Sequence, residues 1–281
     1  MFSHPSRLAG RSRVVATLAG LLALALSSLV VAAPAQAVSA SKLLGHRCHV
    51  YDATATNEDT VAALKDVAAG APGAWCEIDA WRIADGTMIV FHDLTWNRVA
   101  DRSTLPAGVA PTDQVINATW AQVSRIRTKG GQPIPTLQTM IDASAQYHVP
   151  LLVEVKNSVT NPQGVVTYAK NAGASVSYYR DPTSSCVTTT IDPLQKAGAR
   201  VGVKLSNATT CSVAQIQAKH LSFVTQQYWV ATAQYDQSLK NIGVSVYARG
   251  DTRDTSKTTL ANGAAMLLCQ DPRLALAWPG T

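Results

Sequence analysis

Short apolar runs alternate with helix-like stretches along most of this chain, and this alternation constrains the fold more than any other feature. Strands that alternate with helices favour a parallel sheet covered by helices, and eight such strands suit a closed barrel. The expected strands are 43–46, 75–81, 150–156, 175–179, 201–205, 221–226, 244–248 and 265–269. Helical patterns are clearest at 57–69, 137–147, 212–219 and 255–261.

The first 37 residues have the pattern of an export signal and not of a folded domain. Arg7, Arg11 and Arg13 precede a long apolar run, and Ala35-Gln36-Ala37 supplies the small residues that signal peptidase recognises. A permanent membrane anchor is the alternative, because the apolar run is long. The small, more polar residues after Ala37 favour cleavage, so we expect a signal peptide at 1–37 and a secreted protein.

Cleavage near Ala37 leaves 281 − 37 = 244 residues, about the usual size of one TIM barrel. We therefore predict an α/β fold, with residues 38–281 forming a single TIM-type (β/α)8 barrel that carries a β-hairpin insertion after the second strand. Without the three leader arginines, 24 − 3 = 21 basic residues face 18 acidic ones. No basic cluster is dense enough to predict nucleic-acid binding, and the sequence indicates no oligomeric state.

Two carboxylates share one face of the second expected strand. Glu77 and Asp79 are two residues apart, so their side chains point to the same side. Such a pair on an apolar strand is costly unless a cation neutralises it, and oxygen ligands favour magnesium, calcium or manganese over zinc. A pair at the rim that is simply hydrated is the alternative.

A hairpin turn is expected just after this strand. Asp85-Gly86 favours a two-residue type I′ turn, and this register places His92 opposite Asp79. A shift of one residue would send His92 to the other face of the hairpin.

Other polar side chains end neighbouring strands, and the carboxyl ends of barrel strands meet at one rim. His46 and Arg47 end the first strand, while Glu154 and Lys156 end the third barrel strand. Three carboxylates can hold a cation, Arg47 and Lys156 can bind a phosphate, and two imidazoles can act as acid and base. The set suits cleavage of a phosphodiester, although Glu154 and Lys156 alone could be an ordinary ion pair.

These residues lie in motifs that resemble those of the glycerophosphodiester phosphodiesterase family. The resemblance is specific over residues 43–157 and only architectural beyond them. The matching segments are Gly45-His46-Arg47, Asn57-Glu58-Asp59-Thr60, Cys76-Glu77-Ile78-Asp79, Asp85-Gly86, Val90-Phe91-His92-Asp93, Ile134-Pro135-Thr136-Leu137 and Val153-Glu154-Val155-Lys156.

The resemblance implies a TIM-type barrel and a hydrolase that releases glycerol phosphate and an alcohol from glycerophosphodiesters. One divalent cation, Ca2+ or Mg2+, is implied as the cofactor. The substrate's own glycerol hydroxyl can attack phosphorus first in this family, which gives a cyclic phosphate. By position, the implied residues are His46 and His92 for acid–base catalysis, Glu77, Asp79 and Glu154 for the metal, and Arg47, Lys156 and Glu58 for the substrate.

The sequence departs from the family pattern at Cys48, which stands where a glycine follows His-Arg in relatives.

The expected binding partner is a small-molecule or lipid phosphodiester substrate, with at most transient contact with a membrane surface. Two other functions stay open. Sphingomyelinase D and lysophospholipase D enzymes share the two-histidine, acidic layout, and a secreted binding barrel could have lost catalysis.

All five cysteines lie beyond the leader, and their spacing fits no zinc motif. An exported chain can form disulfides, and five cysteines leave at least one unpaired within the chain. Cys186 and Cys211 follow consecutive strands, so we expect them to pair. Cys48 and Cys269 end the first and last strands, which are neighbours in a closed barrel, so we expect a second disulfide there and a free thiol at Cys76.

Overall fold

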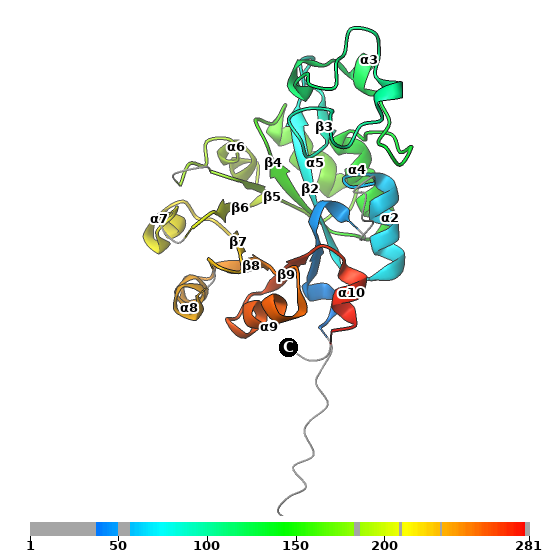
Figure 1. Ribbon diagram of the computed structural model, residues 1–281. Coiled ribbons are helices and arrows are strands. Elements are labelled where there is room, and N and C mark those ends of the chain that lie inside the picture. Colours follow the sequence, from blue (N-terminus) through cyan, green and yellow to red (C-terminus); the bar gives the residue numbers. More distant parts are fainter. Residues whose placement is uncertain (1–37, 50–56, 183–185, 208–209, 231, 279–281) are drawn as a thin grey trace, which may run out of the picture. The chain divides into compact units, whose positions relative to one another are not determined.

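A closed ring of eight parallel strands forms the centre of the protein in this computed structural model (Figure 1). The structure describes residues 38–49, 57–182, 186–207, 210–230 and 232–278, so the expected signal peptide at 1–37 lies outside the described residues. Around the ring, β9 pairs back with β1, and β3 adds to β2 in antiparallel orientation. The strands are β1 (Leu43–Gly45), β2 (Trp75–Arg82), β3 (Met88–Val90), β4 (Leu151–Val155), β5 (Val176–Arg180), β6 (Arg200–Leu205), β7 (Phe223–Gln227), β8 (Ser245–Arg249) and β9 (Met266–Cys269).

Helices follow the barrel strands and surround the ring (Figure 1). Side-chain caps begin several of them: Thr60, Thr136 and Ser212 each accept a hydrogen bond from the backbone N–H three residues on. The α-helices are α2 (Val61–Gly70), α3 (Trp120–Val123), α4 (Leu137–Tyr147), α5 (Pro162–Asn171), α6 (Asp192–Lys196), α7 (Val213–Ala218), α8 (Ala233–Asn241), α9 (Arg253–Ala261) and α10 (Pro272–Leu276). The 3-10 turns are η1 (Ala40–Lys42), η2 (His46–Cys48), η3 (Arg102–Thr104) and η4 (Val115–Asn117).

The strands and helices confirm the expected barrel. Each barrel strand begins and ends within two residues of its expected bounds. The first helix starts at Val61 and not at 57, because Thr60 caps it and leaves the preceding residues outside. None of the helices in the described part of the chain combines the length and the apolar character needed to span a bilayer.

Side chains alternate between two apolar layers, as the period of a strand requires. One layer packs between the strands and the helices and includes Ile78 and Val153. The other fills the barrel itself with Leu44, Leu152, Tyr179, Phe223, Tyr247, Met266 and Leu268. At the amino ends of the strands, the guanidinium of Arg200 lies 5.3 Å from the Phe223 ring centroid and 5.5 Å from that of Tyr247. The carboxyl ends are where polar residues enter the barrel.

The long connection from β3 to α4 builds a small apolar core of its own. Phe91, Trp96, Val99, Val115 and Ile126 are buried within it, together with neighbours from the β2–β3 connection. In Figure 1 this segment, with α3, extends from the β2 and β3 side of the barrel.

The register between β2 and β3 differs by one residue from the expected one. Ala80 lies opposite Val90, and the Ile83 N–H donates to the carbonyl of Thr87, so the turn contains three residues. Gly86, at φ 87°, adopts the left-handed conformation that ends a three-residue hairpin loop. The expected two-residue turn, with Asp79 opposite His92, is therefore wrong.

The disulfides differ in part from those expected. Cys186 pairs with Cys211 as expected. Cys48, however, pairs with Cys76, and Cys269 is left as a buried thiol, so the expected Cys48–Cys269 disulfide and the expected free thiol at Cys76 are wrong. The reason is local: Cys48 does not continue β1 but lies in η2, which turns its Cα to 4.6 Å from that of Cys76.

Candidate active site

Three carboxylates lie together inside the mouth of the barrel. Glu77 and Asp79 point inward from β2, and Glu154 does so from β4, whose register places it beside Asp79. The three residues are between 1% and 6% exposed, and one oxygen from each lies within 4.8 Å of the others. The hydroxyl of Tyr179, on β5, lies 2.7 Å from Glu77 Oε1 and 3.0 Å from Glu154 Oε2.

This crowding changes the ionisation of the carboxylates. Burial, together with the charges of Asp79 and Glu154, raises the pKa of Glu77 to about 8. Burial also acts to raise the pKa of Asp79, but Lys156, His92 and Arg47 together outweigh it and lower the pKa of that carboxyl. The Lys156 Nζ atom lies 2.7 Å from Asp79 Oδ1 and 2.8 Å from Glu154 Oε1. The Arg47 Nε atom lies 4.0 Å from Asp79 Oδ2. When all three carboxylates are ionised they therefore face two cations, which leaves negative charge to be neutralised.

The three carboxylates fit a hard divalent cation. Asp79 Oδ2 is buried and accepts no hydrogen bond from any residue that the structure describes. The set offers oxygen donors alone, which is the ligand type that Ca2+ and Mg2+ prefer. Glu77, Asp79 and Glu154 could hold such an ion, and the ion's charge would lower the cost of ionising Glu77.

His46 and Arg47 reach the site from η2, directly after β1. The Arg47 backbone N–H donates to Glu77 Oε2 at 2.9 Å, which ties the turn to the carboxylates. Burial lowers the pKa of His46 well below its ordinary value, and the nearby Arg249 and Arg47 lower it further. The His46 imidazole is therefore neutral at neutral pH.

His92 lies at the same site although the hairpin register differs from the expected one. β3 ends at Val90, and the chain leaves the strand before His92, so strand alternation no longer decides where this side chain points. The Arg47 Nη2 atom lies 2.8 Å from His92 Nε2, and Asp93 Oδ1 lies 2.7 Å from His92 Nδ1. A guanidinium can only donate, so Nε2 accepts and Nδ1 carries the proton.

Glu58 and Arg98 hold Arg47 and Asp93 in position beside His92. Glu58 is buried and accepts hydrogen bonds from both Arg47 and Arg98. Arg98 also contacts Asp93, at 2.7 Å from Nε to Oδ2. Asp93 and Arg98 follow His92 closely in the sequence. A carboxylate next to a candidate histidine was the available signal for Asp93.

All eight expected site residues are thus brought together: His46, Arg47, Glu58, Glu77, Asp79, His92, Glu154 and Lys156. All of them except Glu77 border one of two cavities, and His46, Arg47 and Arg249 line both of these. The first cavity, about 210 Å³, lies over Asp79, Glu154 and Tyr179. The second, about 170 Å³, has a polar lining that includes His49, Glu58, Arg98 and Gln270.

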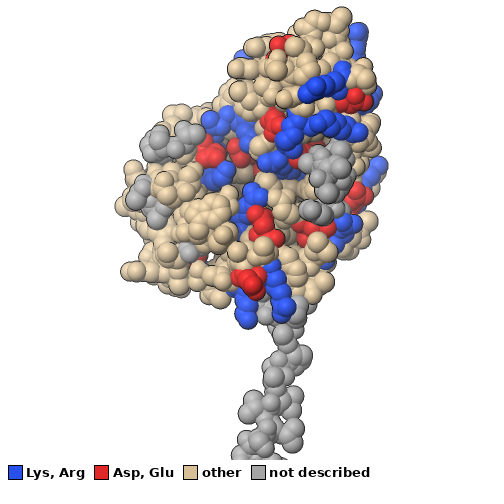
Figure 2. All heavy atoms as spheres, viewed as in Figure 1, with Lys and Arg blue, Asp and Glu red and all other residues tan. Residues whose placement is uncertain are grey.

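The expectations from the sequence did not include several residues of the first cavity. Lys204 is the last residue but one of β6, and its Nζ atom lies 2.7 Å from Asp181 Oδ2. Arg249 ends β8. Lys204 is two residues from Gly202, which lies beside the inward-facing Tyr179 in the sheet register. That alternation could have identified Lys204 once the register was known. Figure 2 shows positive and negative side chains gathered in the middle of the face in view, close to where the strands converge in Figure 1.

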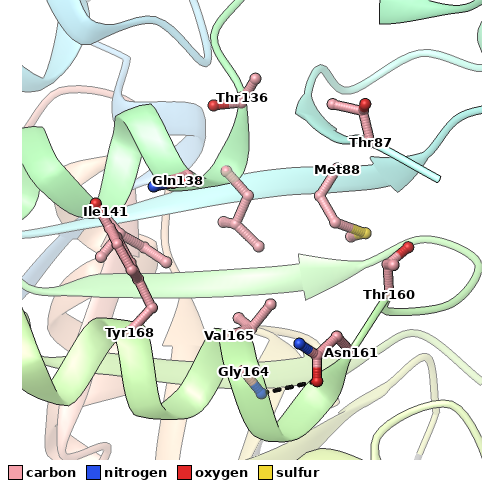
Figure 3. Close-up of a pocket in the computed structure, with 11 residues that line it drawn as sticks. Thr87, Met88, Thr136, Gln138, Ile141, Thr160, Asn161, Gly164, Val165 and Tyr168 are labelled. Carbon is pink, nitrogen blue, oxygen red and sulfur yellow. Dashed lines mark hydrogen bonds between the residues drawn. The ribbon is translucent and has the colours of Figure 1, made fainter. Parts of the chain in front are cut away.

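A third cavity, larger than these two, lies elsewhere. It measures about 370 Å³ and lies outside the barrel, between β3, α4 and α5 (Figure 3). Met88, Ile141, Val165 and Tyr168 face it, while Thr136, Thr160 and Asn161 line its edge. The residues lining it, all within the described ranges, include no acid, histidine, lysine or arginine, so the barrel mouth is the better candidate for chemistry.

Comparison with known proteins points the same way. The sequence profile of the glycerophosphoryl diester phosphodiesterase family matches residues 46–252. Among curated proteins, none matches the sequence significantly.

Solved structures of three bacterial enzymes resemble the fold. A glycerophosphodiester phosphodiesterase from Agrobacterium tumefaciens has a TM-score of 0.65 at 18% identity, covering 84% of this chain and 99% of that one. An Oleispira antarctica phosphodiesterase, in complex with the product sn-glycerol-3-phosphate, has a TM-score of 0.66 at 16% identity and covers 84% and 95%. A Thermotoga maritima glycerophosphodiester phosphodiesterase has a TM-score of 0.59 at 15% identity and covers 84% and 97%. At these identities the likeness establishes the fold alone.

Proposed function

Because this chain belongs to the glycerophosphoryl diester phosphodiesterase family, we propose that it hydrolyses glycerophosphodiesters to glycerol phosphate and an alcohol, using a divalent cation and two histidines. The observation that carries this proposal is the meeting of three buried carboxylates with two imidazoles, Arg47 and Lys156 at one barrel mouth. A phosphodiester needs charge neutralisation and two proton transfers, and this set can supply both.

The residues divide into roles by their contacts. Glu77, Asp79 and Glu154 hold the cation, which supplies Lewis-acid stabilisation of negative charge on the phosphate when it is bound. Arg47 and Lys156 bind the phosphate oxygens, and Glu58 keeps the Arg47 guanidinium in place through contacts at 3.2 Å and 3.3 Å. The cation is Ca2+ or Mg2+, as suits a site of carboxylate oxygens.

The two histidines have different surroundings, and these support different roles. His46 has a lowered pKa, so its free nitrogen can accept a proton from the attacking hydroxyl at neutral pH. His92 has a carboxylate at Nδ1, which stabilises the charged imidazolium that donates a proton to the leaving alcohol. Arg47 donates to His92 Nε2 in the absence of substrate. When substrate binds, the Arg47 guanidinium contacts the phosphate instead, and the freed Nε2 takes up from water the proton that it then gives to the leaving alcohol.

The two cavities on either side of His46, Arg47 and Arg249 accommodate the two substituents of the phosphodiester. The oxygen-rich first cavity, next to the carboxylates and Gln226, suits the glycerol moiety. The polar second cavity, next to Gln270 and Arg98, suits a hydrophilic alcohol better than an acyl chain.

We also propose that the protein is exported and that residues 1–37 are removed. The apolar leader and the small-residue motif before Val38 support this, and so do the two disulfides, which form in oxidising compartments. Amino-terminal analysis of protein recovered from culture medium tests it, with a new end at Val38 as the expected result.

A product assay tests the function. Purified protein is given glycerophosphocholine, glycerophosphoethanolamine, glycerophosphoglycerol or a lysophospholipid, with Ca2+ or Mg2+ and then with chelator. We expect glycerol phosphate from the soluble diesters and little turnover of the lysophospholipid. Cyclic phosphate in the product would identify the substrate's own hydroxyl as the nucleophile, whereas turnover of the lysophospholipid alone would refute the proposed substrate class.

A further inference from the structure

The turn that carries His46 and Arg47 has an unusual backbone. Arg47 and Cys48 have φ values of 57° and 51°, so two consecutive residues with side chains adopt the left-handed conformation. That conformation brings Cβ close to the following carbonyl oxygen and is adopted freely by glycine alone. Something outside the turn must therefore hold it.

Three connections hold this turn against β2 and the chain before α2. The Arg47 N–H donates to Glu77 Oε2 at 2.9 Å, and the Asp59 N–H donates to the Arg47 carbonyl at 2.8 Å. The third connection is covalent, because Cys48 is bonded to Cys76. The disulfide thus joins the residue after Arg47 to the residue before Glu77, and both half-cystines are fully buried.

We propose that the Cys48–Cys76 disulfide is a positioning element of the active site, which keeps His46 and Arg47 in register with the carboxylates of β2. The inference rests on the proposed function. It makes activity depend on oxidation of this one pair, so the chain gains full activity only in a compartment where disulfides form. Misplacement of a catalytic group by about 1 Å can lower turnover by about a hundredfold.

The chain offers a matched control. The Cys186–Cys211 disulfide spans 25 residues and the Cys48–Cys76 disulfide spans 28. Loops of similar length restrict the entropy of the unfolded chain to a similar extent, so loss of either disulfide should lower thermal stability by a similar amount. Cys186 and Cys211 are absent from the lining of both barrel cavities. A general loss of stability and a local loss of positioning can therefore be told apart.

The experiment compares C48A/C76A, C48G/C76A and C186A/C211A with the wild type, well below each melting temperature. We expect kcat of C48A/C76A to fall by about ten- to hundredfold, because alanine at 48 resists a positive φ and the tether is gone. C48G/C76A should recover at least about threefold over C48A/C76A while staying below the wild type, because glycine accepts the φ of the turn. C186A/C211A should stay within about twofold of the wild type.

Equal kcat for C48A/C76A and C186A/C211A would overturn the inference, and so would a lack of recovery in C48G/C76A. If C48A/C76A does not fold, the comparison of C48G/C76A with C186A/C211A decides, and equal turnover again refutes the role. Amide hydrogen exchange at Arg47 and Asp59 needs no substrate. We expect faster exchange there in C48A/C76A and unchanged exchange in C186A/C211A. An inactive wild type with this exchange pattern would refute the proposed function and leave the positioning role standing.

Discussion

Replacing Glu77 with glutamine should stabilise the metal-free protein and abolish its response to metal. The pKa of Glu77 is raised to about 8 from an ordinary value of 4.5, so between these pH values the folded state holds a proton that the unfolded state has lost. Stability then falls as pH rises, by about 1.4 kcal/mol per pH unit. At pH 7 the loss amounts to about 3 kcal/mol, and below pH 4.5 it disappears.

Glutamine removes this loss because it does not ionise. Its amide nitrogen cannot accept a hydrogen bond, so glutamine cannot replace both carboxyl oxygens that face the Arg47 N–H and the Tyr179 hydroxyl, which costs about 1 kcal/mol. The net gain at pH 7 is about 2 kcal/mol, or about 4–8 °C in melting temperature for a chain of this size. Saturating Ca2+ or Mg2+ should raise the melting temperature of the wild type and leave that of Glu77→Gln unchanged.

Thermal melts from pH 4 to pH 8, in chelator and then in excess metal, test both effects. Asp66→Asn is the control, since Asp66 is exposed on α2 and lies outside the site. The wild type and Asp66→Asn should lose stability with rising pH in chelator, while Glu77→Gln loses much less. Identical pH slopes for all three proteins would show that the buried carboxylate does not carry the raised pKa, and the reasoning would fail.

Three further outcomes are expected in activity assays. Chelator should abolish turnover and Ca2+ or Mg2+ should restore it, whereas full activity in chelator would remove the cation from the mechanism. His46→Ala and His92→Ala should each lower kcat by at least about a hundredfold, while His148→Ala, at the end of α4, should stay close to the wild type in the same assay. A histidine base works only when its imidazole is neutral, and the pKa of His46 is lowered. The rise of kcat/KM with pH should therefore have its midpoint below pH 6.5. A midpoint above pH 6.5 would exclude His46 as the base.

The sequence predicted the barrel well because strand alternation is a local property. Lys156 and Glu154 could be assigned to the rim because they end an apolar run. Both lie at the rim in the structure, with Lys156 Nζ 2.8 Å from Glu154 Oε1. His92 was assigned to the site through a register that is wrong by one residue, and it lies there because β3 ends before it. Local turn chemistry at Gly86 decided the register, and the type of turn could not be told from the dipeptide.

The partner of Cys48 could not be predicted from the order of the strands. Gly45 is level with both Cys76 and Cys269 in the sheet, so neighbouring strands alone do not choose between the two partners. The choice depends on the left-handed turn after His46. Cysteine itself does not favour positive φ, and the available sign was that Cys48 stands where relatives have glycine. Lys204 and Arg249 were not predicted as site residues for a related reason. Whether their side chains point into the barrel depends on the register between different strands of the sheet.

The small core of the β3–α4 connection has a consequence for heat inactivation. Trp96, Val115 and Ile126 pack with one another in a cluster separate from the two apolar layers of the barrel, so this segment can open as a cooperative unit while the strand ring stays closed. His92, Asp93 and Arg98 lie at its start and would move with it. Heating should therefore abolish turnover below the temperature at which the barrel loses its circular dichroism, and early proteolytic cuts should fall within this segment.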